Sequence, residues 1–161
     1  MFKARNIAFV LLFSIISLPG FAATTTANLP INATVAAACI LGNITSENFG
    51  NYTGAVNNAT GGIEVNCTNG TTYNISLGPG TFAGATVTTR RMTGTPSGNL
   101  PYALYRDAAR TQNWGQTIGT DTVAGTGTGA VQPYTVYGQI AAGLTPVAGS
   151  YNDTVLITIT Y

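Results

Sequence analysis

The amino-acid sequence predicts an all-β protein built as a sandwich of two packed sheets, on three observations. Apolar and polar residues alternate with a period of two over several runs, as in strands that bury one face. Clusters of glycine, proline and asparagine separate these runs at short intervals. No long stretch has the 3.6-residue period of a helix, and short strands joined by glycine-rich turns are typical of a β-sandwich.

The first segment, Met1–Ala22, has the composition of a secretory signal peptide. Two basic residues precede an apolar run over residues 7–18, and Gly20 and Ala22 fit the small-x-small pattern of a cleavage site. The apolar run is about a dozen residues long, shorter than the roughly 20 that a membrane-spanning helix needs. We therefore expect export, a mature chain that begins at Ala23, and no membrane segment after cleavage.

The expected strands follow this segment in order. The first run is polar over residues 23–28 and then alternates up to Cys39, and the last run alternates up to Tyr161. Threonine, valine, isoleucine and tyrosine, which dominate these runs, suit a pleated and half-buried surface. The runs expected to form strands are residues 29–39, 63–67, 73–77, 86–92, 100–105, 131–140 and 151–161.

Composition excludes several classes of function. Only 7% of the 161 residues are charged, there is no histidine, and there are two cysteines. A Ser-His triad, a histidine zinc site and an all-cysteine zinc site are therefore excluded, and six basic residues are too few for a nucleic-acid-binding surface. We expect no enzyme, cofactor or metal, since the acidic residues are scattered through the chain without a motif for acid-base catalysis. These are Glu47, Glu64, Asp107, Asp121 and Asp153.

The two cysteines, Cys39 and Cys67, are expected to form a disulfide, because both would be oxidised outside the cytoplasm. Closing a loop of this size stabilises the fold by roughly 3–4 kcal/mol in the chain-entropy account. The alternative, a reactive thiol pair, lacks a cationic neighbour in the sequence that would activate it.

Three other features have a structural and a functional interpretation. Trp114 could be a platform for stacking a sugar ring, but a lone tryptophan is more often packed in a core. The segment Arg106–Arg110 could be a small binding site, and we favour a surface turn held by one Arg–Asp pair. The pair Arg90-Arg91 is expected to be a solvated strand end rather than a clamp for a ligand.

The two ends of the mature chain are unusual. The sequence stops inside its clearest strand, at Tyr161, and about 16 residues precede Cys39. The alternation over Leu29–Val35 could be the first strand of a complete sandwich. It could equally be an extension that pairs with the sheet of another molecule. Alternation alone leaves both possibilities open.

Short motifs along the chain match one known family in order and spacing. They are Phe49-Gly50-Asn51-Tyr52, Val65-Asn66-Cys67-Thr68, Tyr73–Gly78, Arg90-Arg91-Met92, Leu104–Thr111, Trp114-Gly115, Val136–Ile140 and Ala148–Thr154. With these motifs the chain resembles the spore coat protein U (SCPU) domain family, which includes the subunits of archaic chaperone-usher pili. The resemblance covers essentially the whole mature chain.

The resemblance implies an incomplete immunoglobulin-like β-sandwich that lacks its final strand. A periplasmic chaperone would lend that strand first, and the N-terminal extension of a neighbouring subunit would then replace it, which is β-strand addition. The implied divisions are a signal peptide (1–22), a donor-strand extension (23–35) and a sandwich domain (36–161). The donor side chains would be Leu29, Ile31, Ala33 and Val35, and the acceptor groove would be lined by Val155, Ile157 and Ile159. The C-terminal Tyr161 would be the handle that the chaperone grips.

The function implied is that of a secreted structural subunit of a fimbria-like surface fibre, assembled head to tail through a chaperone and an outer-membrane usher. Adhesion and biofilm formation would be its roles. Two alternatives belong to other classes: a non-fimbrial spore-coat or cell-surface matrix protein, and a single-domain carbohydrate-binding adhesin.

Overall fold

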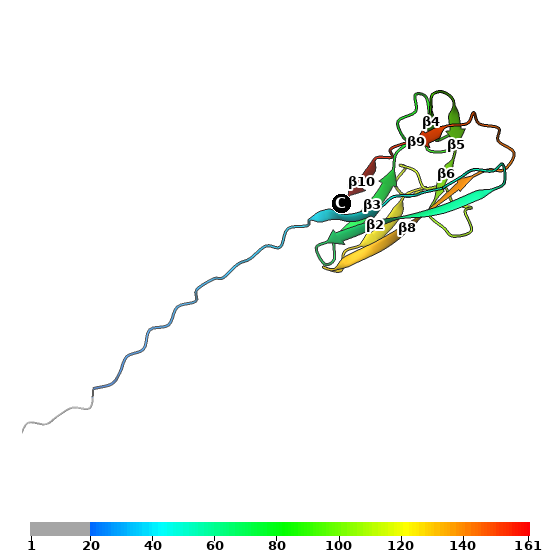
Figure 1. Cartoon of the computed structure of the whole chain (residues 1–161). Coiled ribbons are helices and arrows are strands. Elements are labelled where there is room, and N and C mark those ends of the chain that lie inside the picture. The colour runs from blue at the N-terminus through cyan, green and yellow to red at the C-terminus, as the bar shows by residue number, and fades with distance from the viewer. Residues whose placement is uncertain (1–19) are drawn as a thin grey trace, which may run out of the picture. The chain divides into compact units, whose positions relative to one another are not determined.

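The computed structural model of the chain describes residues 20–161 (Figure 1). The predicted signal peptide, Met1–Ala22, therefore lies outside the described residues except for its last three. The chain divides into an N-terminal unit that ends at Thr34 and a compact body, Val35–Tyr161. Residues 20–38 form neither a strand nor a helix, and their side chains are exposed.

The described residues contain strands and no helix, as the alternation predicts. The strands are β1 (Cys39–Thr45), β2 (Asn57–Cys67), β3 (Thr72–Leu77), β4 (Arg91–Thr95), β5 (Asn99–Pro101), β6 (Ala103–Tyr105), β7 (Val123–Thr126), β8 (Val131–Ile140), β9 (Ser150–Asn152) and β10 (Ile157–Thr160). They form three antiparallel sheets, with the orders β1-β2-β8-β6, β10-β3-β7 and β5-β4-β9. Figure 1 shows the small sheet of β4, β5 and β9 gathered at one end of the body.

The longest pairing, between β2 and β8, forms the centre of the four-stranded sheet. Alternate residues of each strand point to the inside, so Ile63, Val65 and Cys67 of β2 are buried together with Val136 and Ile140 of β8. They pack against residues from the other two sheets to form one core. The remaining core residues are Tyr73, Ile75, Leu77, Met92, Leu100, Tyr102, Leu104 and Trp114.

Two glycines on the inner face of the four-stranded sheet make room for the chain that follows β1. A Cβ atom at Gly61 would lie 2.9 Å from the carbonyl oxygen of Thr45, and one at Gly138 would overlap the carboxyl group of Glu47 and approach the ring of Phe49. The segment 45–49 therefore crosses the inside of the sheet, over positions where a side chain would block it.

Cys39 and Cys67 form the expected disulfide, which joins β1 to β2. The two residues lie directly opposite each other at the start of β1 and the end of β2. The disulfide therefore fixes the first residue of the edge strand to the inner strand beside it.

The prediction for Arg90 is wrong. Its side chain is fully buried and donates hydrogen bonds to four carbonyl oxygens, which belong to Leu77, Gly78, Val87 and Trp114. Desolvation lowers the pKa of this guanidinium, yet it stays protonated at neutral pH because arginine starts from so high a value. Arg90 is thus an interior cross-link between loops, whereas Arg91 is exposed.

Trp114 is a core residue, as the structural interpretation holds. Its indole ring is 1% exposed, and Nε1 donates a hydrogen bond of 2.9 Å to the carbonyl oxygen of Ile75. A ring buried in this way cannot stack on a sugar, so the structure removes the residue on which the carbohydrate-binding alternative depended.

The turn 106–110 is a structural element, but it is not held by an Arg–Asp pair. The carboxylate of Asp107 accepts hydrogen bonds from the backbone amides of Thr111 and Gln112. Arg106 donates instead to the carbonyl oxygen of Thr122, and Arg110 donates to that of Gly138.

Several predicted strands are shorter than expected or divided. Residues 86–89 form a hydrogen-bonded turn and Arg90 is directed into the body, so β4 begins only at Arg91. The run 100–105 is split at Tyr102, and its halves β5 and β6 belong to different sheets. The last run is likewise split into β9 and β10, with residues 153–156 between them.

Candidate functional site

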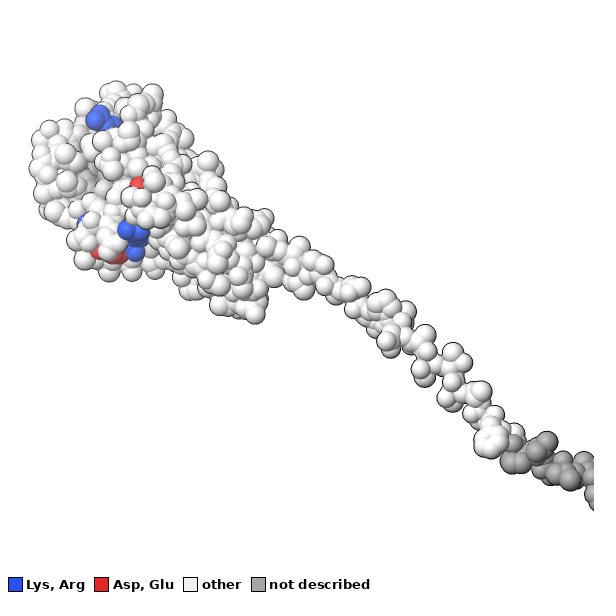
Figure 2. Space-filling view, turned by 180° about the vertical axis from the view of Figure 1, so that it is seen from behind, with Lys and Arg blue, Asp and Glu red and all other residues white. Residues whose placement is uncertain are grey.

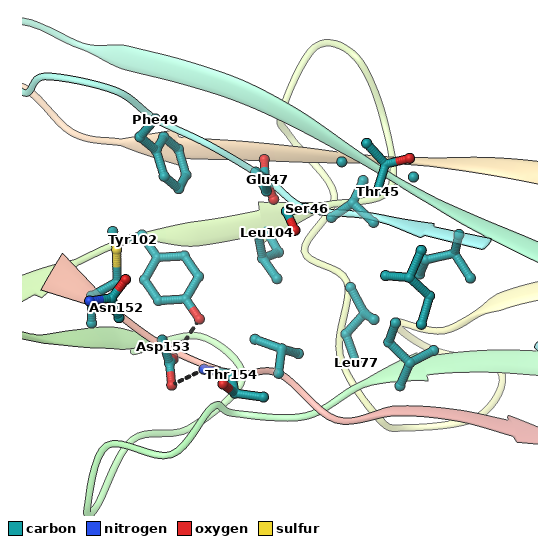
Figure 3. Close-up of a pocket in the computed structure, with 18 of the residues that line it drawn as sticks. Thr45, Ser46, Glu47, Phe49, Leu77, Tyr102, Leu104, Asn152, Asp153 and Thr154 are labelled. Atoms are coloured by element: carbon teal, nitrogen blue, oxygen red, sulfur yellow. Dashed lines mark hydrogen bonds between the residues drawn. The ribbon is translucent and has the colours of Figure 1, made fainter.

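The candidate site is an open groove between two strand edges. β1 lies at the end of the four-stranded sheet and β10 at the end of a three-stranded sheet, so each pairs on one side only. The cavity between them and the segments that continue them has a volume of about 400 Å³ (Figure 3). It is lined by Ile44, Thr45, Ser46, Glu47, Phe49, Gly61, Gly62, Ile63, Leu77, Met92, Tyr102, Leu104, Val136, Tyr151, Asn152, Asp153, Thr154, Val155 and Ile157.

The wall formed by β1 has apolar side chains that face inward and are nevertheless exposed. Leu41 lies opposite Val65, and Ile44 lies opposite Ile63, so both share the inner face with these buried partners. Val65 is 0% exposed and Ile63 is 2% exposed, but Leu41 is 40% exposed and Ile44 is 52% exposed.

A β-bulge keeps both of these side chains on the inner face of β1. The register shifts between Leu41 and Ile44, where the two residues Gly42 and Asn43 of β1 stand against Glu64 alone. Without the extra residue, Ile44 would point to the outer face of the sheet. The bulge thus directs a second large apolar side chain of this edge strand into the groove.

The opposite wall repeats this arrangement. Ile157 and Ile159 of β10 lie opposite the fully buried Leu77 and Ile75 of β3, and both are only half-buried. Val155, which precedes β10, also lines the groove. An apolar strand placed between β1 and β10 would cover the inner side chains of both walls.

One end of the groove is polar. Tyr102 donates a hydrogen bond of 2.6 Å to Asp153, whose carboxylate also accepts from the amide of Thr154 (Figure 3). The same carboxylate accepts from the amide and hydroxyl of Thr81. Desolvation raises the pKa of Asp153, but these hydrogen bonds outweigh it and hold the pKa below its ordinary value. Desolvation and the Asp153 carboxylate raise the pKa of Tyr102. This network fixes the loop before β10.

Glu47 is the other charged side chain of the groove wall. Its Oε1 atom is buried against Gly138 and makes no hydrogen bond to any residue from 20 to 161. Desolvation raises the pKa of this carboxyl group from 4.5 to about 7, although the nearby backbone N–H of Gly138, which is not within hydrogen-bonding geometry, and the positive charge of Arg110 both lower it. The group is therefore partly protonated at neutral pH.

The structure brings together part of the predicted acceptor site. Val155 and Ile157 line the groove, and Ile159 lies next along β10, half-buried against the core. Tyr161 is 61% exposed and borders a second, shallower hollow with Val35 and Ala37. The predicted donor side chains Leu29, Ile31, Ala33 and Val35 lie outside every strand and are exposed.

The sequence interpretation missed the wall formed by β1 and the polar end of the groove. Leu41 has the same parity as Leu29 and Cys39, so the run could have been extended to it, but the bulge breaks the period before Ile44. Nothing in the sequence places Glu47 in a binding site, because single acidic residues are common in exposed loops.

Charged side chains are few on the body, and Figure 2 shows them scattered singly or in small groups over the face in view. Among residues 20–161 no three His, Cys, Asp or Glu side chains come together as they would around a metal ion. In the same part of the chain, no helix combines the length and apolarity needed to cross a bilayer. What distinguishes the groove is therefore exposed apolar surface between two unpaired strand edges.

Comparison with known proteins identifies the family. The sequence model of the Spore Coat Protein U domain matches residues 25–158. The chain belongs to this family. Protein U of Myxococcus xanthus is 40% identical over 159 residues, which are 89% of this chain and 88% of that protein. The SCPU resemblance of the sequence motifs is thereby confirmed.

A solved structure shows the same fold. The CsuC–CsuE chaperone–tip adhesion subunit pre-assembly complex of the archaic chaperone-usher Csu pili of Acinetobacter baumannii matches with a TM-score of 0.59 at 23% identity. The match covers 80% of this chain and 40% of that chain. The Escherichia coli Hda pilus minor tip subunit HdaB matches with a TM-score of 0.37 at 17% identity, over 76% of this chain and 79% of that one. The predicted fold, an incomplete immunoglobulin-like sandwich, is confirmed.

Proposed function

We propose that this SCPU-family chain is an exported structural subunit of a surface fibre, in which residues 23–35 of one copy fill the groove of the next. The observation that carries the proposal is the incomplete burial of inward-facing apolar side chains on both groove walls. Leu41 and Ile44 are exposed on one wall, and Ile157 and Ile159 are half-buried on the other. Exposed strand edges of this kind have unpaired backbone N–H and C=O groups, with which a strand of another chain can pair.

The N-terminal segment has the pattern that such an occupant needs. Leu29, Ile31, Ala33 and Val35 alternate with polar residues, so in an extended strand they share one face. Each large side chain buried there contributes roughly 1.5–3 kcal/mol before ordering costs. The backbone ladder adds about 0.5–1.5 kcal/mol per hydrogen bond. Pro30 cannot donate to the ladder and would sit at the start of the strand or at a non-bonding position.

The geometry of such a contact leads to a polymer. The extension and the groove are different surfaces of the same chain, so the contact is heterologous and repeats from copy to copy without closing. A periplasmic chaperone would cover the groove before assembly and grip the C-terminal Tyr161, and an outer-membrane usher would export the product. The fibre would then lie on the cell surface and serve adhesion and biofilm formation.

A second candidate is a non-fimbrial coat or matrix protein. The family description names a spore coat domain, and Protein U of Myxococcus xanthus matches this chain over most of its own length. Strand exchange could equally build a layer on a cell or spore surface. Genes for a chaperone and an usher beside this gene would favour the fibre, as would fibres in electron micrographs that disappear when the gene is deleted.

The donor role is tested with variants of the mature chain. Each variant is expressed together with a chaperone and an usher. Removing residues 23–35, or making the double substitution Leu29→Asp and Ile31→Asp, should abolish polymers, as measured by electron microscopy and size-exclusion chromatography. The matched control, Asn32→Asp with Thr34→Asp, places the same charges on the opposite face of the strand and should retain polymers. Undiminished assembly after the deletion would refute the donor role.

A further inference from the structure

In the described part of the chain, the carboxyl group of Glu47, which has one buried and unpaired oxygen atom, lies in the wall of the groove. Glu47 belongs to the crossing segment after β1 and lines the groove between β1 and β10, with its carboxyl group packed against Gly138 of β8 (Figure 3). Its Oε1 atom is shielded from solvent and has no hydrogen-bond partner among residues 20–161. Such an atom is costly to bury as part of a carboxylate and much less costly as part of a neutral acid.

The backbone holds Glu47 in this position. The residue follows the last residue of β1 by two positions, and its segment passes over the Cα atoms of Gly61 and Gly138 on the inner face of the sheet. The carboxyl group is packed against Gly138, so it cannot simply turn outward through the sheet. An incoming strand would approach from the one side that is open, and it would displace the water that remains there.

Few other groups can compensate a negative charge on Glu47. The guanidinium of Arg110 lowers the pKa of Glu47, but it donates to the carbonyl oxygens of Gly138 and Ala59 and packs on the ring of Tyr137. From the opposite side of the groove come Tyr102 and, bonded to it, Asp153.

The remaining neighbours leave the charge uncompensated. Tyr151 of β9 also lines the groove, and the facing positions of β2 and β8 are glycine, isoleucine and valine. The buried Arg90 acts on Tyr102 and Asp153 rather than on Glu47. Among residues 20–161, the positive charge that acts on this carboxylate is therefore that of Arg110, which is shared with two carbonyl oxygens.

We propose that Glu47 makes strand uptake by the groove dependent on protonation, so that the groove accepts its apolar strand with one proton and holds it more tightly in mildly acidic surroundings. This inference rests on the proposed function, because it concerns the regulation of the same groove. The proton comes from solvent and is bound by the Glu47 carboxyl group; no covalent bond changes.

The direction follows from burial. In the open groove the pKa of Glu47 is already about 7, and covering the groove removes further water and raises it again. Above that pKa, strand binding must take up a proton, and a one-proton linkage weakens binding by at most about tenfold per pH unit. Residues 23–35 include no ionisable side chain and the chain has no histidine. The α-amino group of a mature extension titrates at about pH 8, so the peptide used as a probe is acetylated to remove this competing titration.

The test uses the mature chain carrying Leu29→Asp and Ile31→Asp, whose own extension cannot fill a groove. Its probe is a fluorescent peptide of residues 23–35, acetylated and amidated at its ends. By anisotropy, the peptide should bind about tenfold more tightly at about pH 6 than at about pH 8. Calorimetry at about pH 8 in buffers of different ionisation enthalpy should show uptake of about one proton.

The matched variants are Glu47→Gln and Glu64→Gln, which change the two glutamates of the chain one at a time. Glu47→Gln should bind the peptide with the same affinity at both pH values, whereas Glu64→Gln should keep the dependence. Equal affinity at both pH values in the parent chain, or a dependence that survives Glu47→Gln, overturns the inference while the proposed function stands. No peptide binding at any pH would refute the proposed function itself. If Glu47→Gln does not fold, the proton uptake of the parent chain decides alone.

Discussion

Ile63 of β2 and Ile44 of β1 are cross-strand neighbours on the same face of one sheet, yet the first is 2% exposed and the second 52% exposed. The same contrast separates Leu77 of β3 from Ile157 of β10 on the facing sheet. The residue types are equally apolar, so the difference comes from position: β2 and β3 have strands on both sides, whereas β1 and β10 each lack one. We call β1 and β10 the open half of the body and the rest of its core the closed half. The open half is built from the same residue types as the core, but each of its strands lacks a neighbour on one side.

The largest effect is expected from the closed half, at Arg90. Arg90→Met removes four hydrogen bonds to buried carbonyl groups and should lower the free energy of unfolding by about 3–5 kcal/mol. Chemical denaturation of the mature protein measures the loss. The neighbouring Arg91→Met, at an exposed site, should change it by less than about 0.5 kcal/mol. Equal effects at the two positions would mean that the closed half does not depend on this cross-link.

The disulfide joins the open half to the closed half and should rank next. Replacing Cys39 and Cys67 by alanine together should lower the free energy of unfolding by roughly 3–4 kcal/mol, because the closed loop no longer restricts the unfolded chain. Chemical denaturation measures the free energy of unfolding of three samples: the oxidised protein, the reduced protein and the double variant. A loss below about 1 kcal/mol would show that pairing with β2 alone secures the edge strand.

Truncating the two cross-strand isoleucines sharpens the contrast directly. Ile63→Ala should destabilise the free protein by about 2–4 kcal/mol, whereas Ile44→Ala should cost less than about 1 kcal/mol because its side chain is already half in water. The affinity for the 23–35 peptide should show the opposite order, because Ile44 would contact the peptide directly. Ile44→Ala should weaken peptide binding by about tenfold. If Ile44→Ala left peptide binding unchanged, β1 would not be a wall of the binding groove.

The smallest effect is a pH dependence of stability that originates in the open half. Folding raises the pKa of Glu47 from 4.5 to about 7, so its stabilising contribution is complete below the lower value and is lost as the pH rises through the higher one. Allowing for solvent screening in the open groove, stability should fall by about 1–2 kcal/mol between about pH 5 and about pH 8. Thermal unfolding of Glu47→Gln should lack this fall, and its persistence there would assign it to another group.

Much of the fold could be predicted from the sequence, because period-two alternation marks the strands that bury one face. The cores of β2, β3 and β8 lie where the alternation places them. The divided runs could not be predicted, since alternation does not reveal where the chain leaves one sheet for another. Tyr102 continues the pattern of its run, yet it bridges two sheets and bonds to Asp153.

Less of the groove could be predicted, for reasons of geometry. Val155 and Ile157 were accessible to pattern analysis because they share the parity of the last run. Ile44 was not, because the bulge at Gly42 and Asn43 changes the parity of β1. The buried positions of Arg90 and Glu47 depend on contacts with segments far away in the chain, and charged residues are usually exposed, so the sequence favours the opposite interpretation.

The position of the disulfide also has a mechanical consequence. Cys39 is the first residue of β1 and lies four residues after the end of the N-terminal extension, and its partner Cys67 ends β2, an inner strand of the four-stranded sheet. In a fibre of the proposed kind, tension on an extension enters the body at this point. The covalent link passes that load to β2, where it is spread over the long β2–β8 ladder as shear, instead of peeling the edge strand away one hydrogen bond at a time.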